Sequence, residues 1–332
     1  MHRPLHASID DVLGPRDSRF LGEGFKRVEH ALSHLAITPG ADGAGSIEAT
    51  AHLTIPGLWS RKGDQSPRPH LSTIDAMILA AQLTGLYAAH TLGLPPHAHF
   101  AVRQLDMKAG SRPDEDDLQE FPVSARLVST GPGGEQGPAT TMDCRIGSLS
   151  ARVHAVHGTG HGPTRSSHVY DRADELPGPW NDAPYGIAHR ARKQLLTQVG
   201  VSTRGPGDPT ASADVTLPGH RAGQIPHGTP ATMIDAFAAV LQLGQVLLYT
   251  LDGVDRADSA NLWMRRTRVT TGTPPGPAHG PARATASLER ARLLPSQAGT
   301  WRTAEVTGAL HAVRIQAGVT HLLPASWHGN DL

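Results

Sequence analysis

Ile74-Asp75-Ala76-Met77-Ile78-Leu79-Ala80-Ala81-Gln82-Leu83 is the stretch that decides the fold, because much of it occurs twice. Ile234-Asp235-Ala236 repeats its first three residues, and Gln242-Leu243 repeats its last two at the same spacing, with an offset of 160. Two other pairs of segments match in the same order at offsets of 162 and 161: Leu53–Gly57 with Val215–Gly219, and Gly147–Leu149 with Gly308–Leu310. Three matches in one order at nearly one offset indicate an internal duplication.

Each copy of the repeated stretch opens a long apolar segment. Residues Ile74–Leu92 and Met233–Leu251 are apolar on nearly every side, which predicts helices that are buried all round. Thr73 and Thr232 are able to cap these helices. Ahead of them, Ser46–Ile55 and Ala211–Leu217 alternate apolar and polar residues as half-buried strands do. The segments predicted as strands after the helices are Phe100–Met107, Pro122–Ser129, Thr140–His157, Leu262–Val269, Ala282–Leu293 and Ala304–Leu323.

A strand, a buried helix and an antiparallel meander are the layout of a hot-dog, in which a curved sheet wraps round one central helix. We therefore predict an α+β protein, a double hot-dog of two fused repeats that form a pseudo-dimer. Residues 1–162 would hold the first repeat with an N-terminal extension, and residues 163–332 the second. The segments Gly22–Leu35 and Tyr185–Leu196 are both rich in Arg or Lys and Leu, and each is expected to add a strand or helix to its repeat.

The composition narrows the function and the compartment. The chain has 332 residues with 30 basic and 30 acidic side chains, so nothing directs it to nucleic acid or to an anionic membrane surface. Cys144 is the single cysteine, which excludes an internal disulfide and suits a reducing compartment. The polar start of the chain lacks the apolar core of a signal peptide, and the apolar stretches are interrupted by Asp or Gln. We expect a cytoplasmic monomer or homodimer without a membrane partner.

The opening Ser18-Arg19-Phe20-Leu21-Gly22-Glu23-Gly24-Phe25-Lys26-Arg27-Val28, together with the two Ile-Asp-Ala helices, resembles the avirulence D family over essentially the whole chain. That family is implicated in making syringolides, which are glycolipid elicitors built from a β-ketoacyl chain and a pentulose. The resemblance implies an acyl thioester substrate, carried by coenzyme A or an acyl carrier protein, and a small polyol or sugar phosphate as its acceptor. It brings no set of catalytic residues with it.

A more distant resemblance is to the dehydratase domains of polyketide synthases, which are double hot-dogs. Their histidine motif reads roughly His-x3-Gly-x4-Pro, and an Asp in their second helix is followed four residues later by Gln or His. This chain has His220-Arg221-Ala222-Gly223 in the second repeat, and Ala239 stands four residues after Asp235. These departures speak against a plain dehydratase.

Asp75 and Asp235 are the leading catalytic candidates, because they take equivalent places at the starts of buried helices. One interpretation is a carboxylate that caps the helix and is favoured by its dipole. The other is a general acid or base in a cleft between the repeats. Histidines in the preceding loops, namely His70, His220 and His227, are candidate proton carriers, since imidazole titrates near neutrality. We expect the working pair to join His220 or His227 to Asp75, or His70 to Asp235.

Four more side chains are candidates for substrate binding. Gln82 and Gln242 lie two helical turns beyond the aspartates on the same face, where bracing a loop is the simpler role. Arg103 and Arg265 are able to hold a phosphate or carboxylate, although solvated charges on strands are the simpler explanation. We find no nucleotide-binding, flavin-binding or zinc-protease motif, so neither a cofactor nor a metal is expected.

These observations favour an enzyme of secondary metabolism acting on a β-ketoacyl substrate. A histidine and a helix-start aspartate would drive condensation or dehydration, joining the acyl chain to its acceptor in the first case. Two alternatives remain: a dehydratase or hydratase of acyl thioesters, and a double hot-dog that binds acyl ligands or proteins without catalysis.

Overall fold

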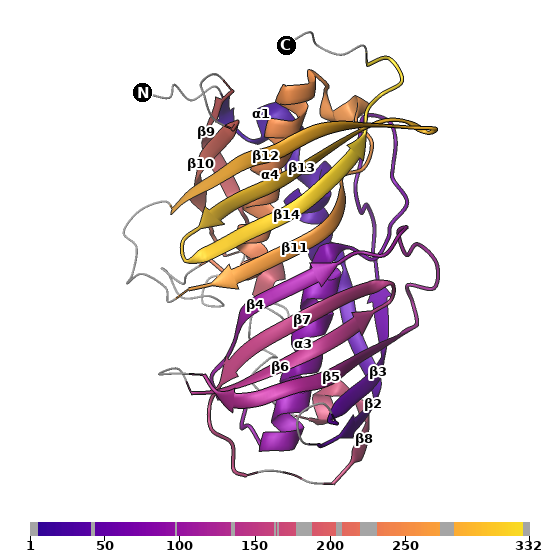
Figure 1. Cartoon of the computed structure of the whole chain (residues 1–332), viewed down its shortest axis with the longest axis vertical. Coiled ribbons are helices and arrows are strands. Elements are labelled where there is room, and N and C mark those ends of the chain that lie inside the picture. Colours follow the sequence, from indigo (N-terminus) through magenta and orange to yellow (C-terminus); the bar gives the residue numbers. More distant parts are fainter. Residues whose placement is uncertain are drawn as a thin grey trace. The chain divides into compact units, whose positions relative to one another are not determined.

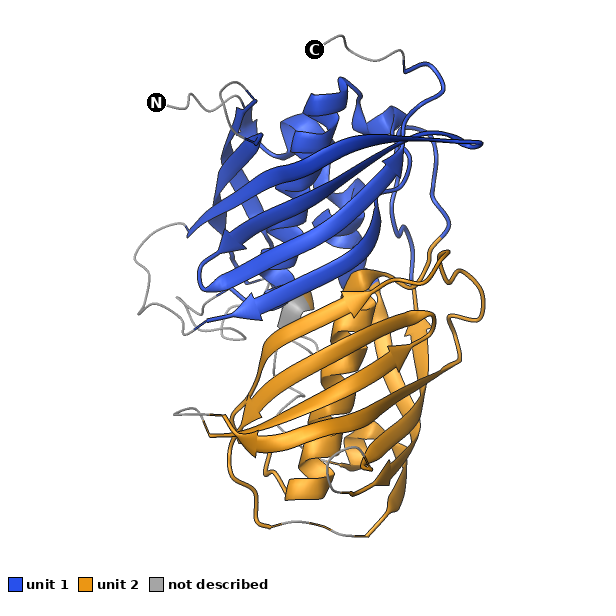
Figure 2. Cartoon of the chain, in the orientation of Figure 1, with its two compact units in different colours: residues 1–27, 56–68, 191–332 blue, residues 28–55, 69–190 orange. Residues whose placement is uncertain are grey.

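A computed structural model describes residues 6–40, 44–96, 98–133, 137–162, 164, 166–176, 188–203, 208–219, 231–272 and 282–327. The chain divides into two compact units (Figure 2). Unit 1 contains residues 1–27, 56–68 and 191–332, and unit 2 contains residues 28–55 and 69–190. Each unit holds one long helix and one set of antiparallel strands, and Figure 1 labels both helices and most of the strands.

Unit 2 is built round α3 (Thr73–Leu92), whose side chains are buried along nearly its whole length. Its strands follow the order β4-β7-β6-β5-β3-β2-β8 and pair antiparallel throughout. The strands are β2 (Glu29–Thr38), β3 (Ser46–Thr54), β4 (Phe100–Lys108), β5 (Phe121–Pro132), β6 (Pro138–Ile146), β7 (Leu149–His157) and β8 (His168–Arg172).

Unit 1 repeats this plan round α4 (Met233–Asp252). Its strands follow the order β1-β9-β10-β12-β13-β14-β11, again with antiparallel neighbours. The strands are β1 (His6–Ser8), β9 (Leu195–Ser202), β10 (Thr210–Thr216), β11 (Trp263–Thr271), β12 (Ala282–Ser296), β13 (Gly299–Leu310) and β14 (Val313–Leu322). Both units are therefore hot-dogs, as the sequence predicts.

The two central helices begin and end in the same way. Ser72 caps α3 and Thr232 caps α4, and each forms a capping box with the aspartate three residues later. The prediction of Thr73 as a cap is therefore wrong by one residue, because Ser72 has the extended backbone of a cap. Gly93 and Gly253 end the helices in the left-handed conformation that suits glycine.

The units do not follow the chain in simple order. The predicted boundary at residue 162 falls within unit 2, because β8 lies beyond it and pairs with β2. At the other end, β1 pairs with β9, so residues 1–27 belong to the unit that holds the C-terminal repeat. One of the sequence matches also fails in detail. Gly147 and Ser148 form the turn between β6 and β7, whereas Gly308–Leu310 lie within β13.

The stretch that resembles the avirulence D family forms short helices in unit 1. After α1 (Asp10–Leu13) come η1 (Arg16–Ser18), the π-helical turn η2 (Phe20–Gly24) and α2 (Phe25–Arg27). Phe25 is fully buried, and the ring of Phe20 lies 4.6 Å from that of Trp59. A Cβ on Gly24 would come within 2.0 Å of the Trp59 carbonyl oxygen, so only glycine allows this approach.

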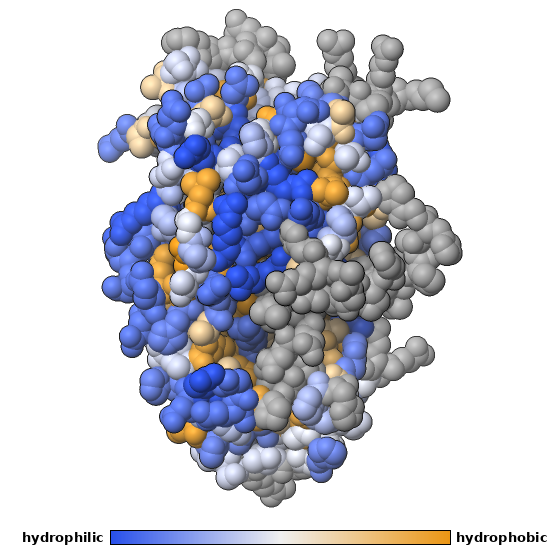
Figure 3. Space-filling view, turned by 180° about the vertical axis from the view of Figure 1, so that it is seen from behind, coloured by the Kyte–Doolittle hydropathy of each residue, from blue (hydrophilic) through white to orange (hydrophobic). Residues whose placement is uncertain are grey.

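The hydrophilic surface and the burial of the most apolar helix both agree with a fold in which strands cover the central helices. On the face drawn in Figure 3, hydrophilic residues predominate and hydrophobic ones form small separate patches. Among the described residues, α4 alone is long and apolar enough to cross a membrane by length and composition. However, 83% of its apolar stretch is buried within the fold. We assign α4 as the core helix of unit 1. The remaining short helices of the described chain are η4 (Ala173–Glu175), η5 (Ala188–Ala191) and η6 (Arg256–Asp258).

Candidate functional site

The first candidate site lies at the start of α3 in unit 2. The Asp75 carboxylate is 1% exposed, and its Oδ2 accepts hydrogen bonds from the backbone amide (2.9 Å) and the hydroxyl (2.6 Å) of Ser72. Its other oxygen, Oδ1, lies 2.8 Å from Nε2 of His30 on β2. The capping box thus uses one oxygen of the carboxylate, and the imidazole uses the other.

His30 and Asp75 form a buried acid–base pair. The two side chains are 4% and 1% exposed, so water does not screen their interaction. Because the carboxylate accepts a hydrogen bond from Nε2, it favours the neutral tautomer whose lone pair is on Nδ1. A histidine oriented by a carboxylate in this way is able to take up a proton at its second nitrogen, and the carboxylate stabilises the imidazolium that results.

The second candidate site lies at the start of α4 in unit 1. Asp235 is fully buried, and its Oδ2 accepts from the amide (2.9 Å) and hydroxyl (2.8 Å) of Thr232 and from Nη1 of Arg192 (2.8 Å). Its Oδ1 accepts from Nε2 of Gln194 at 2.8 Å. Arg192 and Gln194 both donate to the carboxylate, so this aspartate is a hydrogen-bonded anchor at the start of the helix.

Two further ionisable side chains lie near Asp235. Nδ1 of His311, in the turn between β13 and β14, accepts from the Ala231 amide at 3.2 Å. Burial lowers the pKa of His311, and the negative charge of Asp235 opposes that shift. Burial likewise lowers the pKa of Lys26, with Glu23 and, more weakly, Asp235 acting in the opposite direction. His311 also has a positive φ of 54°, in the left-handed region that is uncommon for residues other than glycine.

The two sites correspond residue by residue. His30 and Gln194 each reach Oδ1 of their helix-start aspartate at 2.8 Å. Four residues after each, the strand has a residue with a φ of 52°, His34 in β2 and Gln198 in β9. Histidine in unit 2 is therefore replaced by glutamine in unit 1. Among the described side chains that bond to the two aspartates, only His30 has an imidazole, whose two ring nitrogens are able to donate one hydrogen bond and accept another.

The other predicted site residues lie as follows. His220 and His227 fall outside the described residues. His70 is half-buried in the loop before α3, and the pairing of a histidine from one repeat with the aspartate of the other stays a prediction. Gln242 is 2% exposed and donates to the Ala238 carbonyl of its own helix at 3.0 Å, while Gln82 is half-buried.

The two predicted arginines occupy matching irregular positions. The pairing of β4 shifts between Val102 and Gln104, and that of β11 shifts between Met264 and Arg266, which leaves Arg103 and Arg265 at the bulges. Arg103 is half-buried and Arg265 is exposed. Their assignment to substrate binding stays a prediction.

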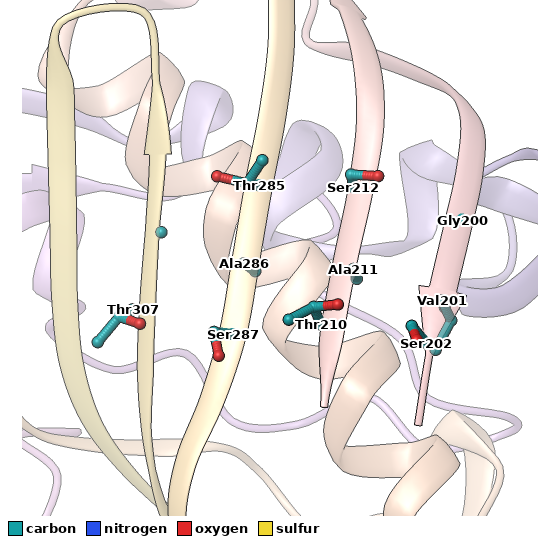
Figure 4. A pocket seen from close by; sticks show the side chains of 11 residues that line it. Gly200, Val201, Ser202, Thr210, Ala211, Ser212, Thr285, Ala286, Ser287 and Thr307 are labelled. Carbon is teal, nitrogen blue, oxygen red and sulfur yellow. The ribbon is translucent and has the colours of Figure 1, made fainter. Parts of the chain in front are cut away.

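A shallow pocket of about 350 Å³ lies on the sheet of unit 1 (Figure 4). Its lining comes from β9, β10, β12 and β13 and consists mainly of Ser, Thr, Gly and Ala, with Ser212 and Thr285 opposite each other in the pairing. No ionisable side chain is among its described lining residues, so these offer no acid–base chemistry. No group of three or more His, Cys, Asp or Glu in the described part of the chain is placed to hold a metal ion.

Two hot-dog units in one chain, each with a buried aspartate at the start of its central helix, define a double hot-dog protein. The chain belongs to the family described as Pseudomonas avirulence D protein (AvrD), whose family model matches residues 4–324. No curated protein matches the sequence.

Several solved structures are similar to the chain at low sequence identity. A tesB protein of Mycobacterium avium subs paratuberculosis is 13% identical, with 82% of this chain and 92% of that chain covered and a TM-score of 0.39. An acyl-ACP thioesterase from Bacteroides thetaiotaomicron is 9% identical, with 89% and 99% covered and a TM-score of 0.37. A variant of the GphF dehydratase is 14% identical, with 89% and 99% covered and a TM-score of 0.35. The assignment of the fold rests on the strand order and buried helices described above.

Proposed function

We propose that this protein is an enzyme of secondary metabolism that acts on an acyl thioester, with His30 and Asp75 as its acid–base pair. The observation that carries the proposal is the 2.8 Å contact between His30 Nε2 and Asp75 Oδ1 in a buried setting. Asp235 instead accepts hydrogen bonds from an arginine and a glutamine, so we propose a structural role for it rather than a role in proton transfer.

Nδ1 of His30 would remove a proton from C2 of the acyl chain, which is acidified by the thioester and, in a β-ketoacyl group, by the 3-keto group as well. Asp75 would stabilise the imidazolium that forms. In a condensation, C2 would then form a carbon–carbon bond to a carbonyl of the acceptor, and the imidazolium would return its proton to the new alkoxide. In a dehydration, the imidazolium would protonate the hydroxyl leaving C3, and a double bond and water would result.

The substrate class follows from the family together with this chemistry. A β-ketoacyl thioester has the most acidic C2 proton among common acyl groups, which suits catalysis by a histidine–aspartate pair. We propose a coenzyme A or acyl-carrier thioester as the donor, and a small sugar phosphate, whose open-chain form has a carbonyl, as the acceptor in the condensing reaction.

The experiment is to incubate the purified chain with β-ketoacyl and 3-hydroxyacyl thioesters, with and without ketose phosphates, and to follow products by mass spectrometry. Loss of water identifies a dehydratase, and a new acyl–sugar adduct identifies a condensing enzyme. Release of free acid identifies a hydrolase and contradicts both. Acyl ligand that binds without any turnover would establish a binding module, in which Asp75 serves only in the capping box of α3.

A further inference from the structure

Unit 1 gathers three cationic side chains from segments far apart in the sequence: Arg19, Lys62 and Arg256. The amide of Arg61 donates to the Ser18 carbonyl at 2.7 Å, which places the loop holding Lys62 beside the turn holding Arg19. Nζ of Lys62 donates to the Ala260 carbonyl at 2.6 Å and to both oxygens of Ser259 at 3.2 Å, just after η6.

Arg19 is buried and incompletely paired. Its side chain is 3% exposed, and its Nη2 contacts Asp10. Its Nε and Nη1 are buried without a hydrogen-bond partner among the described residues. Buried guanidinium donors without acceptors are costly, and each such group calls for an explanation. Nε and Nη1 lie on different edges of the guanidinium, so each is able to donate to a separate anionic oxygen.

Lys62 and Arg256 form no ion pair with an acid within the described chain. Lys62 is 8% exposed and its acceptors are two carbonyls and a hydroxyl, all neutral. Burial and then the charge of Arg256 lower the pKa of Lys62 to about 7. Burial also lowers the pKa of Arg19, to about 10, where Asp10 acts against the shift and Arg256 adds to it. Arg256 is thus the shared neighbour of the other two cations.

Acidic residues close in the sequence do not neutralise this group. Four are exposed, and none forms an ion pair with the three cations within the described chain: Asp17, Asp64, Asp255 and Asp258. Arg256 is half-buried and keeps contact with solvent. The cluster therefore carries more positive charge than Asp10 offsets, and Arg256 is its partly exposed member.

We propose that Arg19, Lys62 and Arg256 bind a phosphoryl group. A phosphate offers three acceptor oxygens and about two negative charges, which match the donors of two guanidinium groups and an ammonium better than a carboxylate does. Under the proposed function, which this last step rests on, the phosphoryl group belongs either to the pantetheine carrier of the donor or to a sugar phosphate acceptor.

The test uses the full chain and inorganic phosphate, measured by calorimetry and by the rise in melting temperature against chloride at equal ionic strength. Arg256→Gln removes the accessible cation, and Arg314→Gln, at an exposed site on β14, is the matched control. We expect Arg256→Gln to weaken phosphate binding at least tenfold, with a melting temperature in phosphate-free buffer no lower than that of the parent, and Arg314→Gln to bind as the parent does. Phosphate that binds both variants alike, or fails to bind the parent, overturns the proposal.

Paired ligands then identify the source of the phosphoryl group. 4′-Phosphopantetheine is compared with pantetheine, and a pentulose phosphate with the free pentulose. The natural ligand belongs to the pair in which the phosphorylated form binds more tightly and loses that advantage in Arg256→Gln. Asp75→Asn separates this site from the proposed reaction, because it should slow turnover and leave phosphate binding unchanged. Loss of phosphate binding in Asp75→Asn would contradict the assignment to these three cations.

Discussion

Gln194 places its amide nitrogen 2.8 Å from Oδ1 of Asp235, the same contact that the His30 imidazole makes with Oδ1 of Asp75. Both are hydrogen-bond donors to a buried carboxylate at a helix start, but only the imidazole has a second ring nitrogen that is able to accept a proton. The duplicated units thus offer an internal control, in which one copy keeps the hydrogen bond with an amide in place of an imidazole.

The substitution His30→Gln gives unit 2 the same type of amide donor that Gln194 provides in unit 1. The fold should survive, because the glutamine amide of Gln194 already supports the equivalent helix start. If His30 moves the proton, kcat for the acyl thioester should fall by about two to four orders of magnitude, with a much smaller change in KM. Steady-state kinetics and urea unfolding on the same sample provide both readouts. Undiminished kcat in His30→Gln would exclude the proposed acid–base pair.

Asp235→Asn should cost more stability than Asp75→Asn. Removing the Asp235 charge takes away the anion that faces buried Arg192, an effect of about 3 kcal/mol. Asn at position 75 still accepts from Ser72, so the loss there should be nearer about 1 kcal/mol. Urea unfolding of the two variants measures the difference. Equal losses would mean that the Arg192–Asp235 contact contributes little to the fold.

Cys144 should be inert in the native protein. Its thiol is buried on β6, and burial raises its pKa to about 12. The thiolate is the reactive form, so labelling by a thiol reagent at pH 8 should be slow and should become rapid in denaturing urea. Fast labelling of the folded chain, followed by absorbance, would show that β6 opens readily at this position.

Lys62 should make stability depend on pH above neutrality. Its folded pKa of about 7 lies below the ordinary value of 10.5, so between these values the unfolded chain binds more protons than the folded one. The free energy of unfolding therefore rises with pH across this window, by up to about 4 kcal/mol from pH 7 to pH 10. The positive charge of nearby Arg256 adds to the effect of burial on the pKa of Lys62.

Lys62→Met should flatten that part of the profile, since the methionine side chain is of similar length and carries no proton. Urea unfolding in phosphate-free buffer at four pH values between 7 and 10 provides the comparison. Parallel profiles for the parent and Lys62→Met would show that Lys62 does not titrate in this window.

Periodicity and repetition were enough to predict the fold. The two Ile-Asp-Ala helices are apolar all round because α3 and α4 are each wrapped by a sheet, and that property is visible in the residue types alone. Asp75 and Asp235 stood out for the same reason, as charged residues at matched places in apolar helices. The capping boxes confirm their location but leave their chemical role to experiment.

The partners of these aspartates could not be predicted in the same way. His30 lies on a strand far before Asp75 in the sequence, and its counterpart is a glutamine, so no shared residue marks the position. The offset between His30 and Gln194 is 164 rather than 160, because the units differ in the length of the segments that join strand to helix. Arg192 and His311 were missed because contacts between elements far apart in the sequence leave no local pattern.

The pairing of β1 with β9 has a consequence for synthesis on the ribosome. The amino-terminal part of unit 1, up to Arg27, emerges first, yet the rest of its unit lies mostly beyond residue 190. Unit 2 has all its residues once the chain has grown to position 190, so it is able to close while the amino-terminal segment still waits. A nascent chain that stalls after unit 2 would expose Phe25, which is fully buried in the complete fold, until the part of unit 1 beyond residue 190 is made.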